Sequence, residues 1–183
     1  MSSSQDPFTL FDHVERVIHS NHSDVCFKVN VDLQARLISI ALDKIADYLK
    51  QLGFNIVSND NDEFTSIFLS LINEANANNL IGSGGVPEKS YLCLACLIYL
   101  LEPEVYVESG FFKGSTLFAA ARSSKVKKII GFDPNHLNLH EVVKNSPIPM
   151  ELHTSDFNTY SFETAILKNS LVFFDDHIST AHR

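Results

Sequence analysis

The chain has 183 residues, of which 45% are hydrophobic, and a formal net charge of −8 at pH 7. This is enough for one domain with a sizeable core, or for one domain with a helical extension. The acidic balance argues against a nucleic-acid partner, because the one basic cluster, Lys125, Lys127 and Lys128, is a short surface turn.

The N-terminal part of the chain carries helical patterns. Apolar residues recur at helical spacing in residues 10–18, 33–52 and 64–72. Gly53 stands where the second of these helices would end, because glycine commonly follows the last helical residue. A glycine-rich break at residues 82–87 comes after the third pattern.

This glycine-rich break divides the chain into two predicted parts. We expect residues 1–85 to form an N-terminal helical region and residues 86–183 to form an α/β domain. The break itself would serve as a linker or, alternatively, as a mobile segment that folds over a bound ligand.

The chain contains three cysteines, and Cys93 and Cys96 are separated by two residues. The run around them, residues 91–101, is wholly apolar and no second pair accompanies it, so we expect core positions rather than a zinc or redox site. An odd cysteine count without a leader-like N-terminus predicts a reducing, cytoplasmic environment. The apolar run is also too short for the ~20 residues of a membrane span.

Residues 104–134 carry the pattern with the clearest functional meaning. A short β-type run at residues 105–107 leads to two glycines, Gly110 and Gly114, and then to a helical pattern and a second strand at residues 128–132. This order of strand, glycine turn, helix and strand predicts a βαβ unit of a nucleotide-binding fold.

Each part of this unit suits a ligand site. The glycines permit a sharp turn and a close approach of the backbone. Ser115 and Thr116 can cap the helix that follows, whose free N–H groups would face the ligand. Asp133 lies 19 residues after Gly114, near the separation at which a strand-end carboxylate binds ribose hydroxyls. The alternative is a plain βαβ unit whose glycines serve only the turn.

The same pattern recurs in the C-terminal part. A strand at residues 151–153 leads to Asp156 and Phe157, and an apolar run at residues 171–174 leads to Asp175. Such a continuous apolar run is typical of a strand buried in a parallel sheet. We therefore predict an α/β fold with a Rossmann-like parallel sheet of about four strands and helices on both faces.

These motifs resemble class I S-adenosylmethionine-dependent methyltransferases, in particular small-molecule and sugar O-methyltransferases with an acidic-x-Gly-x-x-x-Gly-Ser turn. The resemblance covers residues 90–177 and is carried by residues 108–116, 131–133, 155–157 and 173–177. It implies the strand order 3-2-1-4 and S-adenosylmethionine as the cofactor.

The resemblance also implies roles for individual residues. Glu108, Gly110, Gly114 and Ser115 would surround the amino-acid end of the cofactor, and Asp133 would bind its ribose hydroxyls. The predicted sheet indicates the same location for the site, because ligands of open α/β sheets bind outside the carboxyl ends of the strands.

Further roles follow from the resemblance at the later strands. Asp156 and Phe157 would lie near the adenine, and Asp175 would lie at the end of the fourth strand, facing the methyl group and the acceptor. Phe112 departs from the family pattern, because many members have glycine at that position of the turn.

Methyl transfer requires the protein to align the acceptor and to remove its proton. His177 is the candidate base, because imidazole titrates near neutrality and a neighbouring carboxylate, Asp176, can hold one tautomer. Two alternatives stay open: His177 begins the next helix, or Asp175 and Asp176 hold Mg²⁺, which would lower the pKa of an acceptor hydroxyl.

The apolar run at residues 171–174 would form an exposed sheet edge, because the four strands found here are fewer than a complete sheet of this family has. We expect the chain to be a fragment of a longer protein. Alternatively, a second subunit of a homo-oligomer covers this edge, or the last residues fold back over it.

The leading functional hypothesis is an enzyme that transfers a methyl group to a hydroxyl of a small molecule or sugar. One alternative is a degenerate nucleoside-binding domain that acts as an interaction module without catalysis. Another is an NAD-type dehydrogenase, which is disfavoured because the first turn lacks a compact G-x-G-x-x-G.

Overall fold

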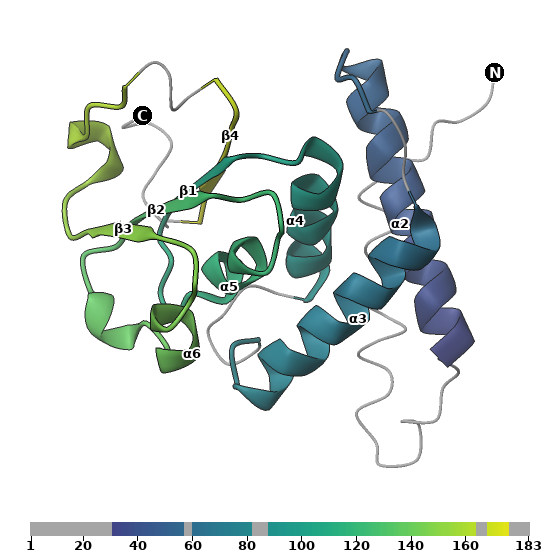
Figure 1. Ribbon diagram of the computed structural model, residues 1–183, viewed down its shortest axis with the longest axis horizontal. Coiled ribbons are helices and arrows are strands. Elements are labelled where there is room, and N and C mark those ends of the chain that lie inside the picture. Colours follow the sequence, from purple (N-terminus) through teal and green to yellow (C-terminus); the bar gives the residue numbers. More distant parts are fainter. Residues whose placement is uncertain (1–30, 57–59, 82–87, 164–167, 176–183) are drawn as a thin grey trace. The chain divides into compact units, whose positions relative to one another are not determined.

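The computed structural model describes residues 31–56, 60–81, 88–163 and 168–175 (Figure 1). In chain order, these residues form α2 (Val31–Gln51), α3 (Asn61–Ala77), α4 (Glu88–Leu101), β1 (Val105–Ser109), α5 (Ser115–Ala121), β2 (Lys128–Phe132), η1 (His136–Asn138), α6 (Glu141–Lys144), β3 (Met150–His153), η2 (Phe157–Thr159) and β4 (Ser170–Phe174). The helix predicted in residues 10–18 and the glycine-rich break lie outside the described residues. None of the described helices is long and apolar enough to cross a membrane.

The described residues form two compact units. The first unit contains α2, the part of α3 up to Ser70, and α4 up to Leu100. The second unit contains the end of α3 and the described residues from Leu101 onwards, including the whole sheet.

Aromatic contacts join α3 to α4 in the first unit. The ring of Phe64 lies 5.0 Å from that of Tyr99 between centroids, and the ring of Phe68 lies 6.3 Å from that of Tyr91. Aromatic pairs at such distances contribute beyond the area that they bury. The hydroxyl of Tyr99 also donates a hydrogen bond to Glu63 at 2.8 Å.

The prediction for Gly53 is confirmed, and the prediction of core positions for the two cysteines is confirmed for Cys96. Gly53 follows α2 with a φ of 89°, and the N–H of Phe54 donates to the carbonyl of Leu49 at 3.0 Å, as in a glycine-terminated helix. On α4, Cys96 is buried and Cys93 is half-buried, and burial raises the pKa of both thiols.

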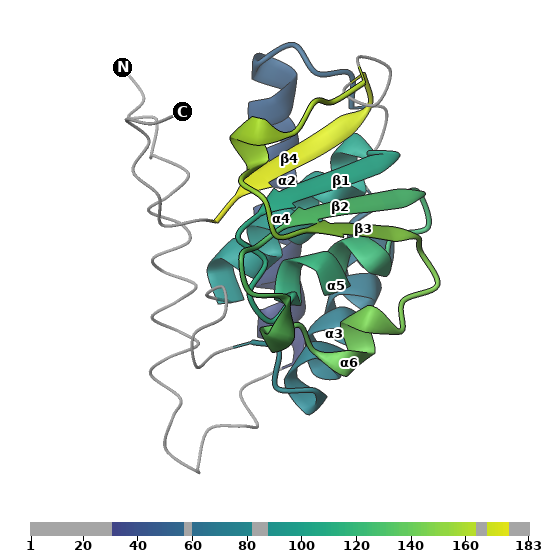
Figure 2. The ribbon, with the colours of Figure 1, turned by 90° about the vertical axis from the view of Figure 1, so that its left-hand side faces the viewer.

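The sheet of the second unit has four parallel strands in the order β3-β2-β1-β4 (Figure 2). The predicted Rossmann-like sheet and its strand order are therefore confirmed. After their first residue, the central strands β1 and β2 are buried, whereas the outer strands β3 and β4 are only half-buried.

Helical segments cover both faces of the sheet, as predicted. On one face α5 packs against β1 and β2, where Tyr106 and Ile129 are fully buried. On the other face Val107, Ile130 and Phe132 form a buried cluster. This cluster is covered by aromatic residues of η2 and of the segment after it, namely Phe157, Tyr160 and Phe162.

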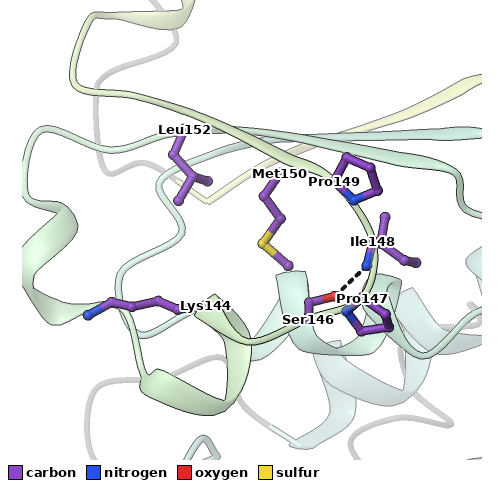
Figure 3. A pocket seen from close by; sticks show the side chains of 7 residues that line it. All are labelled: Lys144, Ser146, Pro147, Ile148, Pro149, Met150 and Leu152. Atoms are coloured by element: carbon purple, nitrogen blue, oxygen red, sulfur yellow. Dashed lines mark hydrogen bonds between the residues drawn. The ribbon is translucent and has the colours of Figure 1, made fainter.

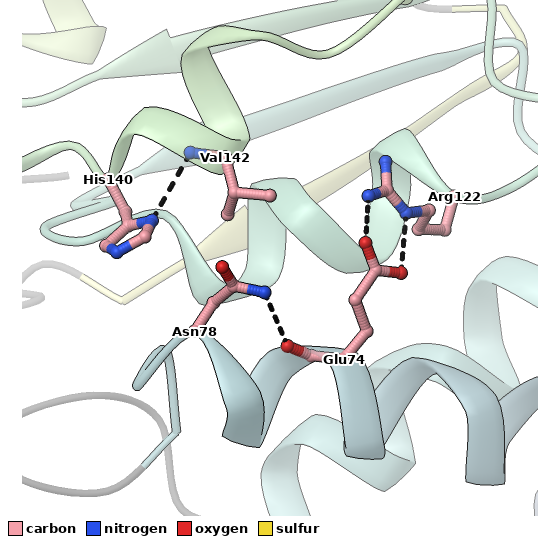
Figure 4. Close-up of polar contacts among 5 residues, drawn as sticks. All are labelled: Glu74, Asn78, Arg122, His140 and Val142. Atoms are coloured by element: carbon pink, nitrogen blue, oxygen red, sulfur yellow. Dashed lines mark hydrogen bonds and ion pairs between the residues drawn. The ribbon is translucent and has the colours of Figure 1, made fainter.

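Polar contacts connect the helices of the second unit (Figure 4). The guanidinium of Arg122, at the end of α5, forms a two-pronged ion pair with Glu74 of α3 and lies 4.4 Å from the centre of the Phe118 ring. His140 caps α6, because its Nδ1 accepts the N–H of Val142 at 3.3 Å. The Arg122 pair lowers the pKa of Glu74, but its partial exposure limits its stabilising effect to about 1 kcal/mol or less.

Candidate functional site

The carboxyl ends of the parallel strands lie along one edge of the sheet. Gly110, Asp133 and Asp175 each follow a strand and donate their N–H to the last carbonyl of a neighbouring strand, at 2.8, 3.0 and 2.9 Å respectively. The structure therefore brings these three predicted site residues to the same edge. The strand order reverses between β1 and β4, which is where open α/β sheets form a crevice for ligands.

The turn after β1 contains three residues with a left-handed backbone. The φ angles are 90° at Gly110, 43° at Phe112 and 83° at Gly114. For Phe112 this conformation costs about 1–2 kcal/mol that a glycine would not incur. Its N–H donates to Oδ2 of Asp133 at 2.8 Å. Phe112 thus departs from the expected glycine in its side chain but keeps a glycine-like backbone.

The start of α5 differs from the prediction. Gly114 is the N-cap residue and no side chain caps the helix, so the expected capping by Ser115 or Thr116 is wrong. A Cβ on Gly114 would lie 2.5 Å from Cδ1 of Leu139, so a larger residue would require this side chain to move, and the φ of 83° also favours glycine here. Ser115 and Thr116 are both buried, and the Thr116 hydroxyl donates to Glu108 instead.

Glu108 lies in the interior between β1 and α5. Its side chain is 0% exposed and accepts hydrogen bonds from the hydroxyls of Tyr106, at 3.1 Å, and Thr116. Burial raises the pKa of Glu108 to about 8; the two hydrogen bonds oppose this shift, and the charges of Asp175 and Asp133 add to it. Glu108 is therefore mainly protonated at neutral pH and is enclosed by protein rather than presented at the edge.

Asp133 holds two turns together at the edge of the sheet. Its side chain is half-buried; Oδ2 accepts the N–H of Phe112, and Oδ1 accepts the N–H of Asn135 at 2.8 Å. A carboxylate has about four acceptor positions, so each oxygen can still accept a hydroxyl donor. Both oxygens are fixed by backbone groups, and this geometry suits a ligand with two adjacent hydroxyls.

The residues predicted to lie near adenine occupy different environments. Asp156 is exposed, and its carboxylate accepts the N–H of Asn158 at 2.8 Å at the start of η2. Phe157 packs instead against the rings of Phe132 and Phe174, at 5.3 and 4.8 Å between centroids. The segment after β3 therefore reaches across the sheet to the end of β4.

Asp175 is exposed at the edge of the sheet, directly after β4. The predicted catalytic residues Asp176 and His177 lie outside the described residues, and so does half of the predicted Mg²⁺ pair. Within the described part of the chain, no three His, Cys, Asp or Glu side chains are grouped so that they could hold a metal ion.

A polar network on β3 was not predicted from the sequence. Glu151 accepts hydrogen bonds from Tyr160 at 2.7 Å, pairs with Lys128 at 2.6 Å and contacts Nε2 of His153 at 2.8 Å. Lys128 and Tyr160 lower the pKa of Glu151 to about 2. The available signal was the spacing of Glu151 and His153, which puts both side chains on one face of a strand.

A hollow of about 340 Å³ lies beside the start of β3 (Figure 3). Its lining combines α6 with the segment that leads into the strand: Lys144, Ser146, Pro147, Ile148, Pro149, Met150 and Leu152. None of the predicted site residues lines this hollow.

Comparisons of the chain with protein-family models, with curated proteins and with solved structures found no match. The function must therefore be inferred from the sheet topology and from its carboxyl edge. This edge combines a left-handed turn, a carboxylate fixed by backbone N–H groups, and aromatic rings beside Asp175. Such an arrangement can bind a ligand that has hydroxyls and a flat apolar part.

Proposed function

We propose that the protein is an S-adenosylmethionine-dependent methyltransferase that transfers a methyl group to a hydroxyl of a small molecule or sugar in the cytoplasm. The observation that carries this proposal is the contact between Phe112 and Asp133. It joins the turn after β1 to the acid after β2, next to the point where the strand order reverses. Open α/β sheets bind nucleosides at this point.

The residues at this edge fit an adenosyl group. Asp133 would accept hydrogen bonds from the two ribose hydroxyls, since both of its oxygens retain acceptor capacity. Phe157 and Phe174, whose rings are in contact, would offer an apolar surface to the adenine. Asp175, which is exposed at the end of β4, would favour the positive charge near the methyl group.

S-adenosylmethionine would supply a methyl group that is already activated, so the remaining tasks of the protein are alignment and proton removal. We assign proton removal to His177, oriented by Asp176. In the alternative assignment Asp175 and Asp176 contribute ligands to Mg²⁺, which would make the acceptor hydroxyl more acidic.

Titration calorimetry of the purified chain with S-adenosylmethionine, S-adenosylhomocysteine and NAD tests the proposal. We expect the first two ligands to bind and NAD not to bind. Asp133→Ala should weaken binding by about 1–3 kcal/mol, the effect of losing hydrogen bonds to a charged group. Asp47→Ala, at an exposed position of α2, is the matched control and should leave the affinity unchanged.

Three results would contradict the proposal: binding of NAD alone, binding of none of the three ligands, or equal affinities of wild type and Asp133→Ala. The last result would exclude Asp133 as the ribose ligand. Circular dichroism of each variant before titration excludes loss of the fold as the cause of weaker binding.

A further inference from the structure

The side chain of Phe112 lies at the surface, and its backbone is strained. It is 38% exposed, and its φ of 43° is one that glycine adopts more easily. The Asp133 contact explains how this backbone conformation is held, but it involves only the N–H and would form equally well with glycine. A strained residue that presents its side chain beside a ligand site indicates a role for that side chain.

Lys113, the next residue, differs from most lysines of the second unit. Four of these lysines form ion pairs with glutamates at 2.6–3.2 Å, namely Lys125, Lys127, Lys128 and Lys144. The ammonium of Lys113 lies instead 5.7 Å from the centre of the Phe112 ring, and among the described residues it forms no ion pair. A cation on an aromatic ring keeps most of its capacity to bind an anion.

The charges at the carboxyl edge make this lysine significant. The turns after the four strands carry the half-buried Asp133 and the exposed Asp156 and Asp175, and Lys113 is the one lysine or arginine in their described residues. Acids suit the sulfonium and ammonium groups of S-adenosylmethionine, but they repel its carboxylate. A positive group at the edge would offset this repulsion.

We propose that Lys113 binds the carboxylate at the amino-acid end of the ligand and that the Phe112 ring positions the Lys113 ammonium for this contact. This inference rests on the proposed function and adds to it the residue pair that recognises the amino-acid end. It also gives a reason for the phenylalanine at a glycine position, since the ring holds the lysine in place at the cost of a strained backbone.

Two ligands distinguish recognition of the amino-acid end by Lys113 from a general effect on binding of the adenosyl group. S-adenosylhomocysteine carries the amino-acid end, whereas 5′-methylthioadenosine has the same adenosyl group without it. Lys113→Gln should lower the affinity for S-adenosylhomocysteine about tenfold, as expected for a lost charge-assisted contact, and leave the affinity for 5′-methylthioadenosine unchanged. Lys113→Arg should keep most of the affinity for S-adenosylhomocysteine. Phe112→Leu should lower the affinity about two- to threefold for S-adenosylhomocysteine only.

Lys168→Gln is the matched control, because Lys168 likewise forms no described ion pair but lies before β4, at the opposite edge of the sheet. It should leave the affinity for both ligands unchanged. Equal losses for both ligands in Lys113→Gln, or no loss for S-adenosylhomocysteine, would overturn this inference and leave the proposed function intact. Failure of the wild type to bind either ligand would overturn both.

Discussion

The two carboxylates at the ends of the central strands occupy opposite environments. Glu108 on β1 is fully buried and contacts only hydroxyl groups, whereas Asp133 after β2 is half-buried and accepts two backbone N–H groups. The strand register explains the difference. Glu108 pairs with Gly131, so Asp133 lies two positions further along the sheet than Glu108 does.

This comparison shows that a strand-end acid can have either of two functions. Glu108 connects β1 to α5 through Thr116 and stabilises the unit from inside. Asp133 connects the turn after β1 to the segment after β2 and leaves acceptor capacity at the surface. We therefore expect changes at Glu108 to affect stability and changes at Asp133 to affect ligand binding.

The largest effect should be the pH dependence of stability that Glu108 causes. Its pKa is about 8 in the folded protein and about 4.5 in the unfolded chain. Between these values the folded state keeps a proton that the unfolded state has released, so the free energy of unfolding falls as pH rises from 4.5 to 8. At ~1.4 kcal/mol per pKa unit, the total change is on the order of several kcal/mol.

Glu108→Gln should remove this slope, because the amide does not titrate. Urea unfolding of both proteins at intervals between pH 5 and 9 measures the difference. Glu151 does not interfere, since its pKa of about 2 confines its effect to pH values below 4.5. Parallel pH profiles for wild type and Glu108→Gln would show that Glu108 is not buried as described.

A smaller effect should follow from removing one hydrogen-bond donor to Glu108. Thr116→Val keeps the shape of the side chain but leaves a buried carboxyl oxygen without this partner, at a cost of about 1–3 kcal/mol. The loss should be greater at pH 9 than at pH 6, because the hydrogen bond favours the ionised form. Thr116→Ser restores the hydroxyl and serves as the control; equal stability of the Val and Ser variants would contradict the assigned contact.

The strand positions could be predicted from the short apolar runs, although β1 continues two residues beyond the predicted run at residues 105–107, and Gly53 marked the end of α2 correctly. The environment of Glu108 could not be predicted, because one or two positions along a strand decide whether a side chain faces α5 or the edge. The start of α5 was missed for a related reason. A left-handed Gly114 can begin the helix, which left Thr116 available to bind Glu108.

Residues 73–79, which contain four asparagines, show another limit of the sequence patterns. The apolar repeat of α3 weakens after residue 72, yet the helix continues to Ala77. Asn79 follows the helix with a φ of 53°, which allows the N–H of Leu80 to donate to the carbonyl of Ala75 at 2.9 Å. The fully buried Ala75 and Leu80 favour this longer helix through packing, which local residue preferences do not report.

The smallest expected effect concerns Phe112, whose backbone Asp133 holds in the left-handed region. Phe112→Gly should be more stable than Phe112→Ala by about 1 kcal/mol, because only the alanine keeps the steric cost of a positive φ. At Asp47, an exposed position within α2, the same pair of substitutions should show the reverse order, since glycine is about 1 kcal/mol less favourable than alanine in a helix. Chemical denaturation of the four variants at one pH measures both differences. If alanine were the more stable residue at both positions, Phe112 would not have the left-handed backbone that connects the turn to Asp133.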